Sequence, residues 1–211
     1  MRTVHNEWLP LKGPGIDRHL SMGDPIAPAR PKFIPAPDPP NEKERMEMLH
    51  SLDLLDTDFE EYFDGVVSVV QKMFDVPYSM ICLLDSNRYF NKSVINFQVE
   101  GPREGIICGY TILKETINVI EDMTLAKNYE NHHLVVNPPY LKFYAGVPLA
   151  IDGCNVGTLC IMDLRPRRFT QADRDALVEY AQSVVRGFEM RKALKEAIEI
   201  SQQSDEDEDE E

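Results

Sequence analysis

The feature that most constrains the fold is a pair of apolar segments joined by a tight turn. Residues 142–151 (KFYAGVPLAI) and 155–163 (NVGTLCIMD) flank Asp152, Gly153 and Cys154. An Asp-Gly pair between two such runs is a strong hairpin signal, because both residues tolerate the positive φ angles of a tight turn. These residues therefore predict two antiparallel strands, and strands this apolar need other elements to cover them.

A second hairpin is predicted earlier in the chain. Residues 78–84 (YSMICLL) have the character of a buried strand, the turn residues 85–87 follow, and residues 88–95 form the return strand. The next ten residues, 96–105, contain two glycines and a proline and indicate a loop. A short strand is expected at 117–121, with short helices over 107–113 and within 122–134.

Helical periodicity lies at both ends of this strand region. Asn41 is predicted to cap a first helix, and a second helix should begin near Thr57 or Asp58 and stop at Pro77. Thr170 is predicted to cap a long helix that reaches about Ile200, or roughly 45 Å at 1.5 Å per residue. Hairpin-connected strands with helices segregated to the ends predict an α+β fold on an antiparallel sheet.

The charge of the chain is unevenly distributed. The formal net charge is −14, and seven carboxylates at 205–211 (DEDEDEE) account for half of it. Such acidity disfavours nucleic acid and anionic membrane as partners, and the acidic tail favours a basic protein partner. Residues 1–40 hold nine of the fifteen prolines and predict a flexible or extended arm, which could lie on the domain through Trp8 or Phe33. The predicted organisation is therefore an arm at 1–40, a domain at 41–200 and a disordered acidic tail at 201–211.

The start of the chain and its cysteines bear on location. The first residues lack an apolar leader segment, and no run approaches the ~18–20 apolar residues that span a bilayer. The four cysteines show no C-x-x-C spacing, so neither a zinc knuckle nor a thioredoxin-type pair is indicated. We expect a cytoplasmic protein with free thiols and no metal site.

Sequence motifs along 41–190 resemble those of a known family. They include Asn41-Glu42, Leu54-Leu55-Asp56-Thr57, Phe74-Asp75-Val76-Pro77, Leu84-Asp85, Phe143-Tyr144-Ala145-Gly146-Val147-Pro148-Leu149, Gly157-Thr158-Leu159-Cys160, and Asp163 with Pro166-Arg167. In this order they resemble the GAF domains of bacterial sensor proteins. The resemblance implies a central antiparallel sheet with the entry and terminal helices on one face. It implies a small-molecule pocket, formed by loops and short helices, on the other.

The resemblance and the residue types together give a set of candidate pocket residues. They are Phe90, Lys92, Arg103, Cys108, Tyr110, Asp122, Tyr129, His132 and Tyr144. The aromatic side chains would form walls, and Lys92 and Arg103 would orient an anionic ligand. Asp122, like Asp163, ends a predicted strand, where a carboxylate commonly caps a turn. His132 and His133 stand where the family more often has Asn-Pro. That departure indicates either an altered ligand preference or drift on a surface loop.

Cys108 lies at the family's pocket-side cysteine position, which makes it the candidate for thiol chemistry. Some GAF proteins reduce free methionine sulfoxide, and that reaction needs a nucleophilic and a resolving thiol. Cys82 and Cys160 fall on predicted strands, and Cys154 falls on a hairpin tip, so none is obviously placed to resolve Cys108. A companion motif expected for that activity is also missing. The alternative is that Cys108 is a small buried apolar residue.

Three functions remain open at this point. The first is a stand-alone GAF sensory or regulatory module that binds a small molecule or signals in trans, through a partner or through a homodimer along the 170–200 helix. Leu177, Val184 and Ile198 share a seven-residue phase on that helix, which Arg191 interrupts. The others are a methionine-sulfoxide-reductase-like thiol enzyme and a ligand-free scaffold for protein interaction. The sequence names no cofactor.

Overall fold

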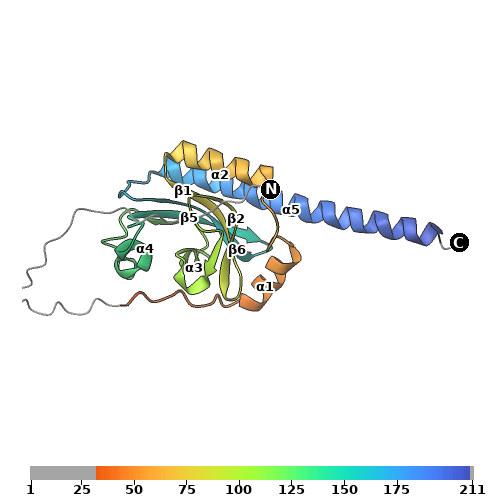
Figure 1. Ribbon diagram of the computed structural model, residues 1–211, viewed down its shortest axis with the longest axis horizontal. Helices are drawn as coiled ribbons and strands as arrows, with labels where there is room; N and C mark the ends of the chain where they lie inside the picture. The colour runs from red at the N-terminus through yellow and green to blue at the C-terminus, as the bar shows by residue number, and fades with distance from the viewer. Residues whose placement is uncertain (1–31, 210–211) are drawn as a thin grey trace, which may run out of the picture. The chain divides into compact units, whose positions relative to one another are not determined.

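The strands form a six-stranded antiparallel sheet in the computed structural model, which describes residues 32–209 (Figure 1). Trp8 and most of the predicted arm lie outside the described residues, as do residues 210–211 and the side chains from Gln202 onward. The sheet order is β3-β2-β1-β6-β5-β4. The strands are β1 (Tyr78–Leu84), β2 (Arg88–Ile95), β3 (Glu100–Pro102), β4 (Asn118–Ile120), β5 (Phe143–Ile151) and β6 (Cys154–Asp163).

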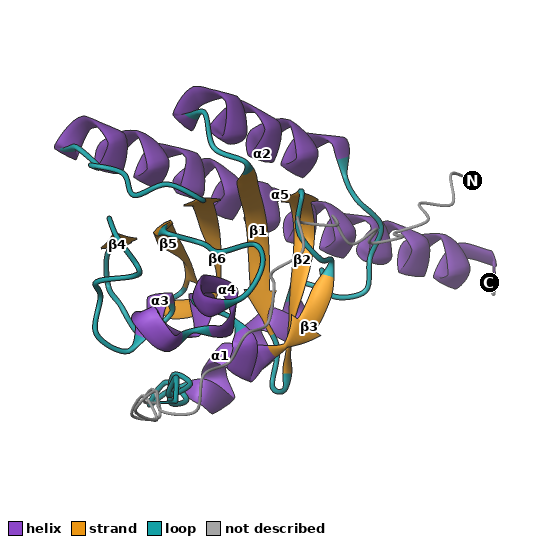
Figure 2. Ribbon diagram, turned by 60° about the vertical axis from the view of Figure 1, so that its left-hand side comes forward, coloured by secondary structure: helices purple, strands orange, loops and turns teal. Residues whose placement is uncertain are grey.

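Helices cover both faces of the sheet (Figure 2). They are α1 (Glu42–Ser51), α2 (Glu61–Phe74), α3 (Cys108–Thr111), α4 (His133–Val136) and α5 (Gln171–Asp209), with 3-10 turns η1 (Arg103–Gly105) and η2 (Tyr129–Asn131). The helices α2 and α5 pack side by side on one face, and the short helices α3 and α4 lie on the other. This confirms the α+β, GAF-like arrangement.

The alternation of side chains along each strand divides the core into two layers. In β1, Ile81 and Leu83 point into the layer beneath α2 and α5. Met80, Cys82 and Leu84 point into the layer beneath α3 and α4. Strands that are buried on both faces lose the polar and apolar alternation of a one-sided sheet, which explains why 78–84 is apolar throughout.

Glycine is required where β1 and β6 approach each other. A Cβ atom built on Gly157 would lie 2.3 Å from the carbonyl oxygen of Cys82, which no real side chain tolerates. This close approach accounts for the glycine of the Gly-Thr-Leu-Cys motif. The β5–β6 turn behaves as predicted, since Asp152 and Gly153 take φ angles of 48° and 78°.

The two hairpins are confirmed to within one or two residues, but three local features differ from expectation. The Asn41 side chain makes no cap hydrogen bond with α1. Helix α2 begins at Glu61 rather than near Thr57 or Asp58, because the Thr57 hydroxyl and the Asp58 carbonyl accept hydrogen bonds from Lys92. The segment 96–105 is also more ordered than a loop, since it contains β3 and η1.

Helix α5 begins as predicted and extends further. Thr170 and Asp173 form reciprocal hydrogen bonds, with the Asp173 N–H donating to Thr170 Oγ1 at 3.2 Å and the Thr170 N–H donating to Asp173 Oδ2 at 2.8 Å. We expected the helix to end near Ile200 and a disordered tail to follow, but the backbone is helical to Asp209. No proline or glycine follows Gly187, so the sequence offers no strong stop signal.

Candidate functional site

Three cysteine side chains meet in the core layer beneath α3. Cys82 comes from β1, Cys108 from the first residue of α3 and Cys160 from β6, and all three are buried free thiols. The Sγ atoms of Cys108 and Cys160 lie 3.6 Å apart. The Tyr144 hydroxyl donates to Cys108 Sγ at 3.5 Å and is itself 2.7 Å from the Thr111 hydroxyl. We call Cys82, Cys108 and Cys160 the thiol cluster.

The members of the thiol cluster have different environments. Burial raises the pKa of Cys108, but hydrogen bonds from the thiols of Cys160 and Cys82 and from the Tyr144 hydroxyl lower that pKa well below its usual range. Burial and the hydrogen bond with Cys108 raise the pKa of Cys82. The hydrogen bond with Cys108 and burial likewise raise the pKa of Cys160. Cys108 is therefore the sulfur in this group that carries negative charge most readily.

The sequence leaves none of the other cysteines obviously placed to resolve Cys108, whereas the structure puts the sulfur of Cys160 in contact with it. Strand alternation alone puts residues 158, 160 and 162 on one face of β6. The sequence does not reveal that α3 packs against that face, with Cys108 as its first residue. The juxtaposition depends on tertiary packing across 52 positions of the chain, and no local signal predicts it.

Apolar side chains fill the space around the thiol cluster. This layer contains Met80, Leu84, Tyr89, Ile106, Ile107, Ile112, Ile120, Met123, Leu134, Val135, Leu141, Tyr144 and Met162, all buried. A ligand that entered between the sheet and α3 would have to displace some of them. The pocket that the family resemblance implies on this face is thus occupied by core side chains.

Residues 33–38, which we call the strap, run across the outside of this layer. The Asn128 side chain holds the strap at Ile34, accepting from the Ile34 N–H at 3.0 Å and donating to the Ile34 carbonyl at 3.2 Å. The Tyr110 hydroxyl donates to the same carbonyl at 2.8 Å. Ala36 lies over α3, since its Cβ would be 3.2 Å from a Cβ built on Gly109. The arm was predicted to contact the domain through Trp8 or Phe33, and the Phe33 contact is confirmed.

His132 lies beneath Phe33 and is fully buried. The two ring centroids are 4.4 Å apart in an edge-to-face arrangement. His132 Nδ1 accepts from the Leu134 N–H at 3.1 Å and so caps α4, whereas Nε2 has no hydrogen-bond partner among the described residues. Burial, with a smaller contribution from His133, lowers the pKa of His132 to about 4. A neutral imidazole in a helix cap explains His132 without a ligand.

Two of the predicted pocket residues lie on the other face of the sheet. Phe90 belongs to the core layer under α2 and α5. Lys92 is buried next to the start of α2, where its ammonium lies 2.7 Å from Glu60 and 2.6 Å from the Asp58 carbonyl. The structure therefore separates Phe90 and Lys92 from the thiol cluster and the strap.

Arg103 and Asp122 have structural partners. Arg103 donates to Glu42 at 2.5 Å and pairs with Asp38 at the end of the strap at 3.2 Å. Asp122 accepts from the N–H and the hydroxyl of Thr124, which confirms the predicted turn cap. Tyr129 packs edge-to-face on Tyr110, with 5.6 Å between ring centroids. Seven of the nine candidates thus lie on or near the α3–α4 face.

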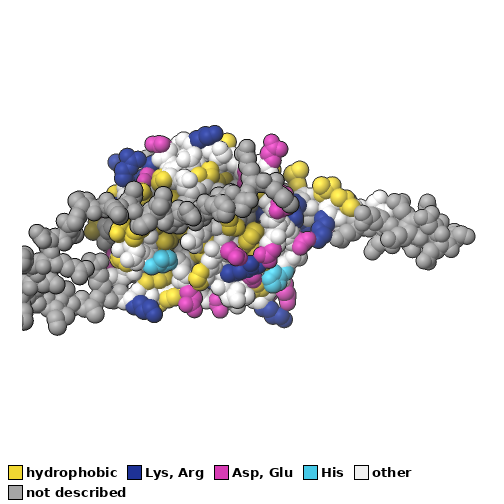
Figure 3. All heavy atoms as spheres, in the orientation of Figure 1, with side chains coloured by type: hydrophobic (Ala, Val, Ile, Leu, Met, Phe, Trp, Pro, Cys, Tyr) yellow, Lys and Arg dark blue, Asp and Glu magenta, His cyan; other side chains and the backbone are white. Residues whose placement is uncertain are grey.

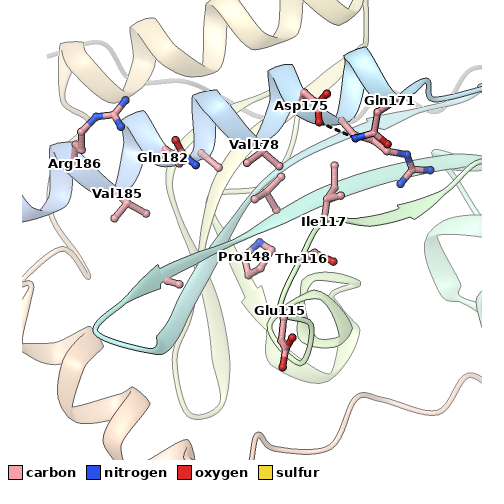
Figure 4. Close-up of a pocket in the computed structure, with 14 residues that line it drawn as sticks. Glu115, Thr116, Ile117, Pro148, Gln171, Asp175, Val178, Gln182, Val185 and Arg186 are labelled. Atoms are coloured by element: carbon pink, nitrogen blue, oxygen red, sulfur yellow. Dashed lines mark hydrogen bonds between the residues drawn. The ribbon is translucent and has the colours of Figure 1, made fainter.

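A groove of about 650 Å³ lies between α5 and the β4–β5 edge of the sheet (Figure 4). Its apolar surface includes Ile117, Val147 and Val178, and charged or amide side chains stand along its rim. The rim residues are Glu115, Gln171, Arg174, Asp175, Gln182 and Arg186. Gln171 and Asp175 are joined by a hydrogen bond of 2.7 Å. The groove is assembled from three distant segments, so no local pattern in the sequence predicts it.

The second half of α5 carries exposed apolar side chains. Met190, Leu194 and Ile198 are 73%, 63% and 49% exposed and recur every four residues. Figure 3 shows apolar side chains where α5 leaves the rest of the domain. Between Met190 and Leu194, Arg191 ties the helix to the domain by donating to Glu60 at 2.9 Å and to the Asp53 carbonyl at 2.8 Å. We call Met190, Leu194, Ala197 and Ile198 the α5 seam.

Two classes of feature are not found in residues 32–209. No helix in this range is both long enough and apolar enough to cross a bilayer. No group of three or more His, Cys, Asp or Glu side chains in the same range is arranged to hold a metal ion.

Comparison with known proteins agrees with this architecture. The GAF domain family model matches residues 58–186, which is more than half of the chain. The chain belongs to the GAF domain family. A curated relative, the cyclic di-GMP phosphodiesterase PA2567 of Pseudomonas aeruginosa, is 32% identical over 147 residues; the match covers 68% of this chain and 25% of the relative. The chain thus matches only a quarter of that protein's length.

Solved structures of low sequence identity share the fold. Free methionine-R-sulfoxide reductase from Neisseria meningitidis, solved with its substrate, has a TM-score of 0.55 at 19% identity, covering 72% of this chain and 90% of that one. The GAF domain of PixJ from Thermosynechococcus elongatus, in its blue-light-absorbing form, has a TM-score of 0.53 at 19% identity, covering 72% and 92%. These likenesses establish the fold and leave the function to the residues of this chain.

Proposed function

We propose that this chain is a GAF regulatory module whose output is the pairing of its α5 helix with α5 of a second copy. The observation that carries the proposal is the α5 seam. Met190, Leu194 and Ala197 follow the four-then-three spacing of a coiled-coil seam. Met190, Leu194 and Ile198 are about half to three-quarters exposed, and an exposed apolar stripe on a helix favours a partner helix.

The charged side chains of this stretch leave the seam clear for self-association. Glu189, Lys192 and Glu196 lie on the side of the helix away from the seam, because each residue turns an α-helix by about 100°. The relative named as a cyclic di-GMP phosphodiesterase supports a place in signalling for the matched segment.

Sedimentation equilibrium of the full chain tests this output. The wild type should form a dimer of two 24.2 kDa chains at micromolar concentrations. The variant Leu194→Glu/Ile198→Glu should be a monomer, because it puts two carboxylates into the seam. Lys192→Glu is the matched control: it changes the net charge by the same amount on the opposite side of the helix, and it should leave the dimer intact. A wild-type monomer at tens of micromolar would contradict the proposal.

The groove beside α5 is the second part of the proposal, as a site for a small molecule. Its volume is within the range of about 300–1,000 Å³ typical of ligand sites, and it combines an apolar surface with a few polar groups. A ligand in the groove would contact Gln182, Val185 and Arg186 on α5, and so would act directly on the helix that carries the seam.

A thermal-shift screen with cyclic nucleotides and small metabolites tests the groove, because a ligand that binds only the folded state raises the apparent Tm. Ala150→Trp should abolish any shift, since Ala150 is an exposed residue that lines the groove. Ala172→Trp is the matched control, because Ala172 is exposed on α5 outside the groove lining. A shift that survives Ala150→Trp would assign the ligand to another site.

The methionine-sulfoxide-reductase alternative has less support in the geometry. The space beside Cys108 that a free amino-acid substrate would need is filled by side chains of the α3–α4 layer. Turnover of free methionine sulfoxide that disappears in Cys108→Ala would establish the enzyme and overturn this assignment.

A further inference from the structure

Within the thiol cluster, the sulfur atoms of Cys108 and Cys160 are in direct contact. Their sulfur atoms lie 3.6 Å apart, so forming a bond of ~2.05 Å requires an approach of about 1.5 Å. Cys108 lies at the start of a four-residue helix that can make such a movement more readily than β6. We propose that Cys108 and Cys160 form a reversible disulfide when the protein meets a peroxide, and that Cys108 is the sulfur oxidised first.

The hydroxyl groups around the pair favour this order. The Tyr144 hydroxyl donates to Cys108 Sγ at 3.5 Å, so a thiolate at Cys108 has a hydrogen-bond donor in place. The Thr158 hydroxyl is fully buried and faces Cys108 as a hydrogen-bond donor that favours the thiolate. Strand alternation puts Thr158 on the same face of β6 as Cys160, and it pairs in register with Cys82. The same donor would also serve an oxygen atom on Cys108.

The chemistry balances with hydrogen peroxide as the oxidant. The Cys108 thiolate attacks one peroxide oxygen, the O–O bond breaks, and the products are a sulfenic acid on Cys108 and hydroxide, which takes up a proton to become water. Cys160 sulfur then attacks the sulfenic sulfur. The S–O bond breaks as the S–S bond forms, and the departing oxygen leaves as water with the Cys160 proton. Two thiols and one peroxide molecule thus give one disulfide and two water molecules.

Access to the pair depends on the strap. Both thiols are buried, and Ala36 lies against Gly109, the residue after Cys108. A molecule of peroxide, which is little larger than water, can reach Cys108 only when α3 and the strap move apart. The Asn128 hydrogen bonds to Ile34 oppose that movement. Oxidation should therefore be slow in the wild type and faster when the strap is loosened.

The test treats the full chain with hydrogen peroxide and follows thiol number, intact mass and a peptide map without reductant. We expect two of four thiols to be lost, the mass to fall by ~2 Da, and one cross-link to join the peptides of Cys108 and Cys160. Dithiothreitol should reverse all three changes. Cys108→Ser and Cys160→Ser should abolish the cross-link, and the matched control Cys82→Ser should retain it. Cys160→Ala serves if Cys160→Ser does not fold, because a serine there adds a buried hydroxyl.

Two results would overturn the inference. One is a wild-type chain that keeps four thiols at a peroxide concentration that oxidises them in the unfolded chain. The other is a cross-link that joins two chains or includes Cys82. Asn128→Ala tests the route of access, and the rate of thiol loss should rise by about five- to thirtyfold, since the loss of about 1–2 kcal/mol raises the population of the open state by that factor. An unchanged rate would exclude access through the strap.

Discussion

Asn128 binds the backbone of Ile34 with both ends of its side-chain amide, the carbonyl oxygen accepting at 3.0 Å and the amide nitrogen donating at 3.2 Å. A peptide group offers one donor and one acceptor, so the amide satisfies both at a single residue of the strap. Asn128 does this from a backbone with a positive φ angle of 76°. The contact therefore holds a strained residue in place.

Substitution of Asn128 should reveal both the contact and the strain. Asn128→Ala removes two hydrogen bonds and should lower the free energy of unfolding by about 1–2 kcal/mol. Asn128→Gly removes the same bonds but adopts the positive φ angle without strain, so its loss should be smaller. Urea unfolding of both variants measures the difference. Equal losses would show that the backbone at Asn128 carries no strain.

His132 should make stability depend on pH below neutrality. Its pKa is about 4 in the folded protein against 6.5 for the ordinary side chain. Because the folded pKa is the lower one, the unfolded chain binds the extra proton between pH 6.5 and 4. The stabilisation is complete above pH 6.5 and is lost as the pH falls toward 4, by about 3 kcal/mol.

Urea unfolding at pH 7 and pH 4.5 tests this dependence. His132→Asn keeps an acceptor for the Leu134 N–H and removes the titrating group, so its stability should change much less over this interval. His133→Asn is the control, because His133 is exposed and should leave most of the wild-type dependence. A wild-type profile that matches His132→Asn would contradict a buried neutral imidazole.

Two glycines should respond in opposite directions to the same change. Gly157→Ala forces a Cβ against the Cys82 carbonyl oxygen and should cost more than about 2 kcal/mol. Gly65→Ala, in the middle of α2, has nothing within 4 Å of the new Cβ and should stabilise the protein by about 0.5–1 kcal/mol. Thermal unfolding of the two variants side by side provides the comparison. A neutral Gly157→Ala variant would mean that β1 and β6 can separate more easily than their register suggests.

Lys92 and Glu60 should be coupled. The buried ammonium lies 2.7 Å from the Glu60 carboxylate, whereas Glu60 keeps Arg191 as a second partner at 2.9 Å. Lys92→Met should therefore cost about 2 kcal/mol, mainly through the Thr57 and Asp58 oxygens left without a donor. A double-mutant cycle with Glu60→Gln should give a coupling energy of about 0.5–3 kcal/mol. Additive losses would mean that the ion pair contributes nothing beyond packing.

The elements of this fold were largely predictable, because strands buried on both faces leave unbroken apolar runs. Residues 78–84 and 142–151 are examples, and the Asp152-Gly153 turn predicts the β5–β6 hairpin. The boundary of α2 was not predictable. Thr57 is a good helix cap in isolation, but here its hydroxyl accepts a hydrogen bond from Lys92, which lies on β2, 35 positions further along the chain. Local propensity cannot anticipate a distant partner of that kind.

The candidate site was less predictable than the fold. The family resemblance brought Cys108, Tyr110, Tyr129, His132 and Tyr144 to one face, and the structure places them there. It also implied a pocket, which the core side chains of this chain fill. Two contacts depend on how α3 and the strap pack against the sheet. They are the contact of Cys160 with Cys108 and the hydrogen bonds of Asn128 to Ile34. Neither has a signature in residue spacing.

The strand order has a consequence for how the chain reaches this structure. Met80 on β1 pairs with Cys160 on β6, so the two central strands of the sheet lie 80 positions apart in the sequence. Until β6 is available, the β1–β2 hairpin exposes the backbone of β1 as a bare edge that other chains can join. Contacts between such distant segments slow folding. During synthesis, the β1–β6 pairing at the middle of the sheet therefore forms last, and the β1 edge of the β1–β2 hairpin stays unpaired until then.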